Sequence, residues 1–106
     1  MNITIHFSRF FPDNVVVHPG EAVTFVVRNT DPIDHEFILG DRHVQRFYEK
    51  GTETFHTPKP GVMTVPADTT RVTTYLFPLQ GGQLLFGCHV PGHYAYGMRG
   101  LVTISD

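Results

Sequence analysis

The sequence predicts an all-β protein, a β-sandwich or barrel of about seven to eight short strands. Apolar and polar residues alternate with a period of two along much of the chain, as they do in half-buried strands. Turn-forming Gly, Pro, Asn and Asp residues separate these runs at regular intervals. The 106 residues, 41% of them hydrophobic, suit one folded core, so we expect a single domain over residues 1–106.

The first half of the chain contains four candidate strands. In NITIHF, residues 2–7, the side chains of Ile3, Ile5 and Phe7 share one face. Two apolar runs, NVVV and AVTFVVR, then flank a His-Pro-Gly turn signal. The polar stretch Asn-Thr-Asp-Pro ends the second run, and HEFIL, residues 35–39, is the fourth candidate strand.

The second half adds three more strands after a long excursion. TRVTTYLF is rich in the β-branched and aromatic residues that strands prefer, and QLLFGC and GLVTIS follow it. The excursion covers residues 41–66. Val44, Phe47 and Tyr48 stand at helical spacing, Asp41 is a candidate N-cap and Gly51 a stop signal, which indicates one short helix. We expect the prolines that follow to break regular structure up to residue 66.

Composition excludes several classes of function. The formal net charge is −2 and no run of basic residues exists, which argues against nucleic acid or an acidic membrane surface as a partner. No apolar stretch is long enough to cross a bilayer, and the first residues lack the features of a signal peptide. The single cysteine excludes an internal disulfide, so its thiol is free or bound to a partner or metal.

That cysteine lies in GCHVPGHYAYGMRG, a stretch that gathers soft metal ligands. Cys88, His93 and Met98 follow the spacing C-x4-H-x4-M, and a loop that folds back brings three such side chains together. Gly92 and Gly97 precede two of them and permit the backbone angles that a tight loop needs. Thiolate, imidazole and thioether together are typical of a blue copper site, which also needs a second histidine. His35, which follows a polar loop, is the best candidate.

The whole chain resembles a small cupredoxin, the family of plastocyanin and azurin. VVVHPGEAVTFVVRNTD is similar to the family's second and third strands, DHEF to its upstream ligand and CHVPGHYAYGM to its ligand loop. The loop spacing resembles that of rusticyanin and of the copper domains of multicopper oxidases. The resemblance implies a Greek-key β-sandwich, an extracytoplasmic or periplasmic location, and one copper ion per chain.

Carried over by position, the resemblance implies that His35, Cys88 and His93 are equatorial copper ligands and that Met98 is the axial ligand. It also implies a redox protein partner that docks transiently on an apolar patch around Pro91, His93, Tyr94 and Tyr96. We expect the chain to be a monomer.

Other histidines are expected to lie outside the site. Multicopper oxidases have a histidine on each side of the cysteine, and here Gly87 replaces the first, so we expect His89 to point away from the metal. We expect surface positions for the rest: His6, His18, His43 and His56. Glu36 stands where plastocyanin and azurin have Asn, a difference in a residue that helps to hold the cysteine sulfur.

Three functions fit these observations. The first is a mobile electron carrier with one type 1 copper and no enzymatic activity. The second is a protein of copper handling that delivers or sequesters the metal, for which His89, His43 and His56 are candidate further ligands. The third, an enzyme such as a nitrite reductase or oxidase, needs catalytic ligands from further domains or subunits, so we do not expect it of this chain.

Overall fold

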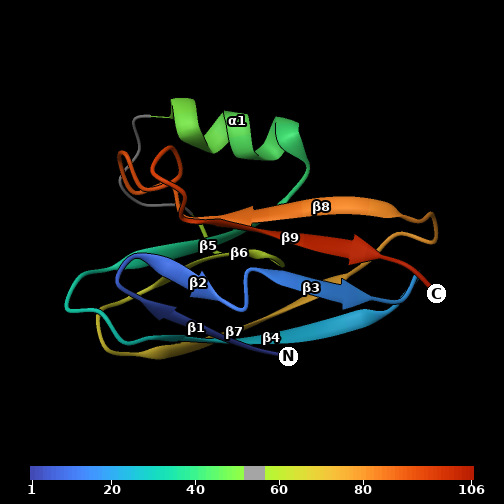
Figure 1. Cartoon of the computed structure of the whole chain (residues 1–106), viewed down its shortest axis with the longest axis horizontal. Helices are drawn as coiled ribbons and strands as arrows, with labels where there is room; N and C mark the ends of the chain where they lie inside the picture. Colours follow the sequence, from blue (N-terminus) through green and yellow to red (C-terminus); the bar gives the residue numbers. More distant parts are fainter. Residues whose placement is uncertain (52–56) are drawn as a thin grey trace.

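Two β-sheets face each other in a computed structural model of the protein, which describes residues 1–51 and 57–106 (Figure 1). One sheet has the strand order β2-β1-β4-β7 and the other β3-β9-β8-β5-β6. The prediction of an all-β fold with two layers is therefore confirmed. Within the described part of the chain the elements are β1 (Asn2–His6), β2 (Arg9–Phe11), β3 (Asn14–Val17), β4 (Ala22–Asn29), β5 (His35–Gly40), α1 (Arg42–Lys50), β6 (Val62–Val65), β7 (Thr70–Leu76), β8 (Gly82–Gly87) and β9 (Arg99–Ile104).

The core lies between the sheets and follows the predicted alternation. In β4, Val23, Phe25 and Val27 are buried while the residues between them are more exposed, because successive side chains of a strand point to opposite faces. Aromatic rings fill the centre of the core, where they pack in tilted and edge-to-face contacts. These rings belong to Phe10, Phe25, Phe37, Phe77 and Phe86. This packing holds strands β5 and β8 in place, and the candidate ligands lie at one end of these strands.

Strand β5 is buried on both faces because α1 covers its outer side. Phe37 and Leu39 belong to the core between the sheets, whereas Ile38 packs with Tyr48 of α1 on the opposite face. Figure 1 shows α1 above β8, at the same end as the loop that follows β8. The helix therefore lies beside the segment that carries the candidate ligands.

The short helix is confirmed, including its two ends. The Asp41 carboxylate accepts a hydrogen bond from the Val44 backbone N–H at 2.9 Å, as an N-cap does, and Gly51 ends the helix in an extended conformation. The buried face differs from the expected one, because α1 buries Gln45 and Tyr48 while Phe47 is 73% exposed. With nine residues, this helix is too short to cross a membrane, and it is the one helix of the described chain.

Two expectations for the strands were wrong, and one strand was not predicted. Phe7 does not share the buried face of β1, because it enters the β1–β2 turn with a φ of +50° and is 80% exposed. The excursion is not irregular up to residue 66, because β6 forms after the prolines and pairs antiparallel with β5. Strand β2 was not expected at all, since three residues are too few to show alternation, yet it pairs with β1 and buries Phe10.

Candidate metal centre

Three side chains from separate segments converge at one end of the sandwich. His35 opens β5, Cys88 follows the last residue of β8, and His93 lies in the loop between β8 and β9. The Cys88 Sγ atom lies 3.8 Å from Nδ1 of His35 and 3.7 Å from Nδ1 of His93. Each of the three residues offers one ligand atom, and these three atoms all lie within 4.8 Å of one another. Within the described residues this is the one group of His, Cys and acidic side chains arranged in this way.

The spacing of these atoms fits a metal ion. A nitrogen ligand and a sulfur ligand 120° apart, at ordinary metal–nitrogen and metal–sulfur lengths of about 2.0–2.1 and 2.3 Å, would lie roughly 3.8 Å from each other. The observed separations of 3.7 and 3.8 Å agree with that value. Two imidazoles and one thiolate with a methionine nearby are the donor set of a blue copper site, rather than of a structural zinc site.

The loop from 88 to 98 folds back as expected and brings Met98 beside the cluster. Its backbone closes through hydrogen bonds from Met98 N–H to His93 O at 2.9 Å and from Cys88 N–H to Met98 O at 3.1 Å. Gly92 and Gly97 have φ angles of +84° and +104°, which L-residues with side chains rarely adopt. The Met98 side chain is fully buried in the same core cluster as Cys88.

A carboxylate that the sequence analysis missed holds His35 in place. Asp31 Oδ2 lies 2.8 Å from Nε2 of His35, the ring nitrogen that does not face Cys88. The same carboxylate accepts hydrogen bonds from the backbone N–H groups of Phe7 and Ser8, at 2.7 and 2.8 Å. Asp31 thus joins the β1–β2 turn to the metal centre. The motif Asp-x-x-x-His in the polar loop before β5 was the one signal in the sequence that pointed to it.

The charge of Asp31 fixes which nitrogen of His35 is free. Burial tends to raise the pKa of this carboxyl, but hydrogen bonds from the Ser8 backbone, the His35 ring and the Phe7 backbone outweigh burial and lower it. The ionised carboxylate therefore accepts the Nε2 proton of His35. The lone pair of Nδ1 then faces Cys88, as a metal ligand requires.

The thiol of Cys88 is fully buried, and burial favours its protonated form. Burial raises the pKa of Cys88 to about 11, although backbone hydrogen bonds from Glu36 and Val90 lower it in part. The Glu36 backbone N–H donates to Sγ at 3.3 Å. Because a backbone group makes this contact, the change from Asn to Glu does not remove it. The Glu36 carboxylate instead accepts a hydrogen bond from the His89 backbone N–H at 3.1 Å.

His93 is half-buried, and its surroundings favour the neutral ring. Burial and the neighbouring His35 both lower the pKa of His93, while Asp31 raises it in part. A neutral imidazole is the form that binds a metal. The two histidine rings lie 5.2 Å apart between centroids.

His89 lies outside this cluster, as expected. Its Nε2 atom lies 2.6 Å from Oε1 of Gln45 in α1, and its ring stacks on Tyr94 at 4.5 Å. His6, His18 and His43 are exposed, whereas His56 lies outside the described residues. In the predicted docking patch, Pro91 and Tyr96 are exposed, but the Tyr94 ring is turned towards α1.

The family and the fold are both matched by known proteins. The copper binding proteins of the plastocyanin/azurin family match residues 2–105. The structure of auracyanin B superposes with a TM-score of 0.82 over 100% of this chain and 88% of that one, at 19% identity. A reduced auracyanin from Roseiflexus castenholzii gives a TM-score of 0.81 over 99% and 95%, at 18% identity. At these identities, the two structures show the fold alone.

Two proteins that are similar to this chain in sequence have the same name. The copper-resistant cuproprotein CopI of Rubrivivax gelatinosus is 33% identical over 101 residues, which cover 91% of this chain and 59% of that protein. The protein of the same name from Vibrio cholerae is 33% identical over 94 residues, or 83% and 53%. The chain thus spans little more than half the length of these relatives.

Proposed function

Because the chain belongs to the plastocyanin/azurin family of copper-binding proteins, we propose that it carries single electrons on one copper ion. The equatorial ligands in this proposal are His35, Cys88 and His93. Met98 is the axial ligand, which its buried position beside Cys88 and His93 supports. When bound, copper supplies a Cu(I)/Cu(II) couple that gains or loses one electron.

The observation that carries the proposal is that hydrogen bonds from neighbouring groups hold the candidate ligands in place. Strand β5 presents His35 with its ring held by Asp31, and the Cys88 sulfur receives a backbone hydrogen bond from Glu36. Backbone hydrogen bonds close the loop around His93. Ligands held in this way move little when the charge of the metal changes, and small movement favours fast electron transfer.

The same proposal includes where the protein acts, what kind of partner it has, and that it does not catalyse a reaction. The chain acts outside the cytoplasm, and a redox protein docks transiently at the patch of Pro91, His93, Tyr94 and Tyr96. The half-exposed His93 ring and the exposed side chains of Pro91 and Tyr96 support this contact. We expect no enzymatic activity from the chain itself, because one candidate metal cluster is present in its described part.

A second function, copper handling, is favoured by the names of the relatives. Both CopI proteins are copper-resistant cuproproteins, and their lengths exceed that of this chain. In this alternative the same ligands hold copper for delivery or storage, and electron exchange is secondary.

Copper stoichiometry and voltammetry distinguish the two functions. An electron carrier binds one copper per chain and gives a fast, reversible one-electron wave. More than one tightly bound copper, together with slow electron exchange, would instead support copper handling. Met98→Leu should shift the potential and Met63→Leu should not, since Met63 is a buried methionine of β6. Equal shifts in both variants would argue against Met98 as the axial ligand.

A further inference from the structure

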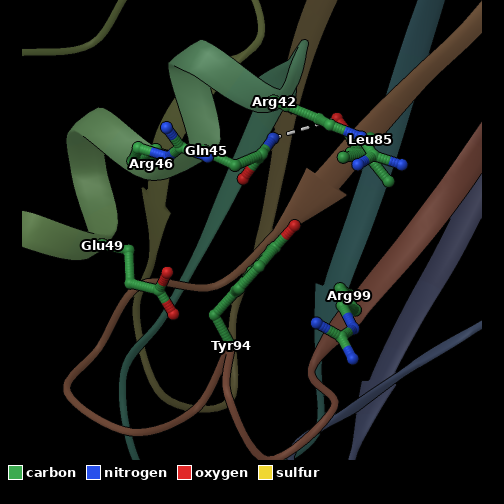
Figure 2. Close-up of a pocket in the computed structure, with 7 residues that line it drawn as sticks. All are labelled: Arg42, Gln45, Arg46, Glu49, Leu85, Tyr94 and Arg99. Carbon is green, nitrogen blue, oxygen red and sulfur yellow. Dashed lines mark hydrogen bonds between the residues drawn. The ribbon is translucent and has the colours of Figure 1, made fainter.

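A second feature of the molecule is a cationic pocket beside the metal centre. The pocket has a volume of about 370 Å³ and lies between α1, the loop after β8 and the start of β9. Arg42 and Arg46 line it from α1, and Arg99 lines it from β9. Figure 2 shows Tyr94 extending from the loop into the space between the helix and Arg99.

The described lining of this pocket carries a net positive charge, because three arginines face a single glutamate. The one ion pair between described residues joins His35 to Asp31, so no carboxylate pairs with the three guanidinium groups of the pocket. Glu49 is the one acidic residue of its lining, while the whole chain has a net charge of −2. The pocket therefore has the opposite sign to the molecule as a whole. Such a local field attracts an anionic ligand.

The chemistry of the lining favours carboxylates of a protein. The guanidinium group binds a planar carboxylate through two parallel hydrogen bonds, and Arg and Tyr are common at protein interfaces. The three arginines are exposed, so a carboxylate carried on a protein surface can reach them. The Arg99 guanidinium carbon lies 5.4 Å from the centre of the Tyr94 ring, which holds this side chain at the mouth of the pocket.

The pocket also connects to the candidate metal centre. Tyr94 stacks on the ring of His89 with 4.5 Å between centroids and 21° between planes. His89 is bonded through the backbone to Cys88. The rings of Tyr94 and His89 would therefore lie between a partner in the pocket and Cys88.

We propose that the pocket lined by Arg42, Arg46, Arg99 and Tyr94 is a docking site for carboxylates of an acidic partner protein. It adjoins the apolar patch around His93, with which it shares Tyr94. The redox character of the partner rests on the proposed function, whereas the binding of carboxylates does not.

The test uses a hexaglutamate peptide as the probe and the ¹⁵N-labelled apoprotein. We expect saturable shifts of backbone amides in the first half of α1 and in residues 94–99, which weaken as salt is added. The double variant Arg42→Gln/Arg46→Gln should bind the peptide about fivefold to tenfold more weakly. The double variant Arg28→Gln/Arg71→Gln removes the same charge from exposed positions of β4 and β7, and it should bind within about twofold of the original protein.

Three results would overturn the proposal. Equal weakening in both double variants would show attraction to overall charge. Shifts in residues 91–96 without any in α1 or at Arg99 would place the contact on the apolar patch instead. Binding of inorganic phosphate more tightly than the peptide would show a site for small anions. Copper is absent from this experiment, so its failure would leave the electron-carrier proposal intact. A failed voltammetry experiment would likewise leave the docking site intact.

Discussion

At the scale of single residues, the centre depends on how neighbouring groups hold the candidate ligand atoms. The Cys88 sulfur faces one nitrogen of each histidine, and the ring of His35 is fixed by a charged carboxylate on its other side. The thiol is buried, so its proton is the one feature of the cluster that a copper ion must displace.

Copper binding should release the proton of Cys88. Because burial raises the pKa of this thiol to about 11, the apoprotein keeps the proton at pH 7 to 9, and the metal competes with it. The apparent affinity for Cu(I) should then rise about tenfold for each pH unit in this range. Titration of Cu(I) into the weakly buffered apoprotein should release about one proton per copper near pH 8. Binding without proton release would show that the thiol is already ionised.

Asp31 should affect both the stability and the redox potential. In Asp31→Asn the amide cannot accept from Phe7, Ser8 and His35 together, and we expect a loss of about 1–3 kcal/mol in the free energy of unfolding of the apoprotein. The potential should rise, because a carboxylate on the imidazole favours Cu(II).

The matched control for this carboxylate is Asp34→Asn. It changes a nearby exposed carboxylate that accepts one backbone N–H, from Ala67, and an amide oxygen can accept the same bond. Urea unfolding and voltammetry measure the two effects. An unchanged potential in a folded Asp31→Asn protein would contradict this role.

At the scale of elements, close approaches of backbone and side chain hold β8, β9 and α1 together. A Cβ atom at Gly100 of β9 would lie 2.2 Å from the Phe86 ring of β8. Gln45 of α1 donates from Nε2 to the backbone carbonyls of Ile38 and Leu85, at 2.9 and 3.1 Å. The Gly100 contact sets the approach of β9 to β8, and the Gln45 hydrogen bonds hold α1 against the sheet. The ligand loop connects β8 to β9 beside this helix.

Gly100→Ala should destabilise the protein by about 1–3 kcal/mol or more, because the Phe86 ring sits in a packed core and cannot yield. Gly51→Ala is the control, since its new Cβ would meet backbone oxygens at an ordinary 3.5 Å. We expect its free energy of unfolding to stay within about 0.5 kcal/mol. Urea unfolding of the two apoproteins measures both. Equal effects would mean that the ring moves aside.

The sequence predicted elements well where local pattern decides the structure. The buried Val23, Phe25 and Val27 follow strict alternation, and the Asp41 cap depends on one neighbouring N–H. Strand β6 was missed because prolines flank it in the sequence, and it forms through its pairing with β5. Asp31 was missed because its partners Phe7 and Ser8 come close only in the folded chain. The four candidate ligands were predicted because their spacing resembles a known family, and three of them meet in space.

At the scale of the whole molecule, the core of the sandwich includes two of the candidate ligands. Cys88, Met98 and the core phenylalanines belong to one continuous cluster between the sheets. The loop that carries His93 is closed by its own backbone hydrogen bonds. These contacts predict that the fold forms without copper.

Removal of copper should leave the sheets intact and lower the stability. We expect the far-ultraviolet circular dichroism of the apoprotein to match that of the loaded protein. Free copper at one hundred times its dissociation constant should add about 2.7 kcal/mol to the free energy of unfolding. In Cys88→Ser this gain should largely disappear. An apoprotein without β-sheet signal would show instead that the metal organises the fold.

The central claim is that Cys88, together with His35 and His93, binds copper as a thiolate. The most direct test is the visible and electron-spin resonance spectrum of the Cu(II)-loaded protein, recorded beside that of Cys88→Ser. We predict intense visible absorption from the copper–thiolate bond in the original protein, and its loss in the variant. A colourless copper-loaded protein, with a spectrum that Cys88→Ser leaves unchanged, would contradict the account.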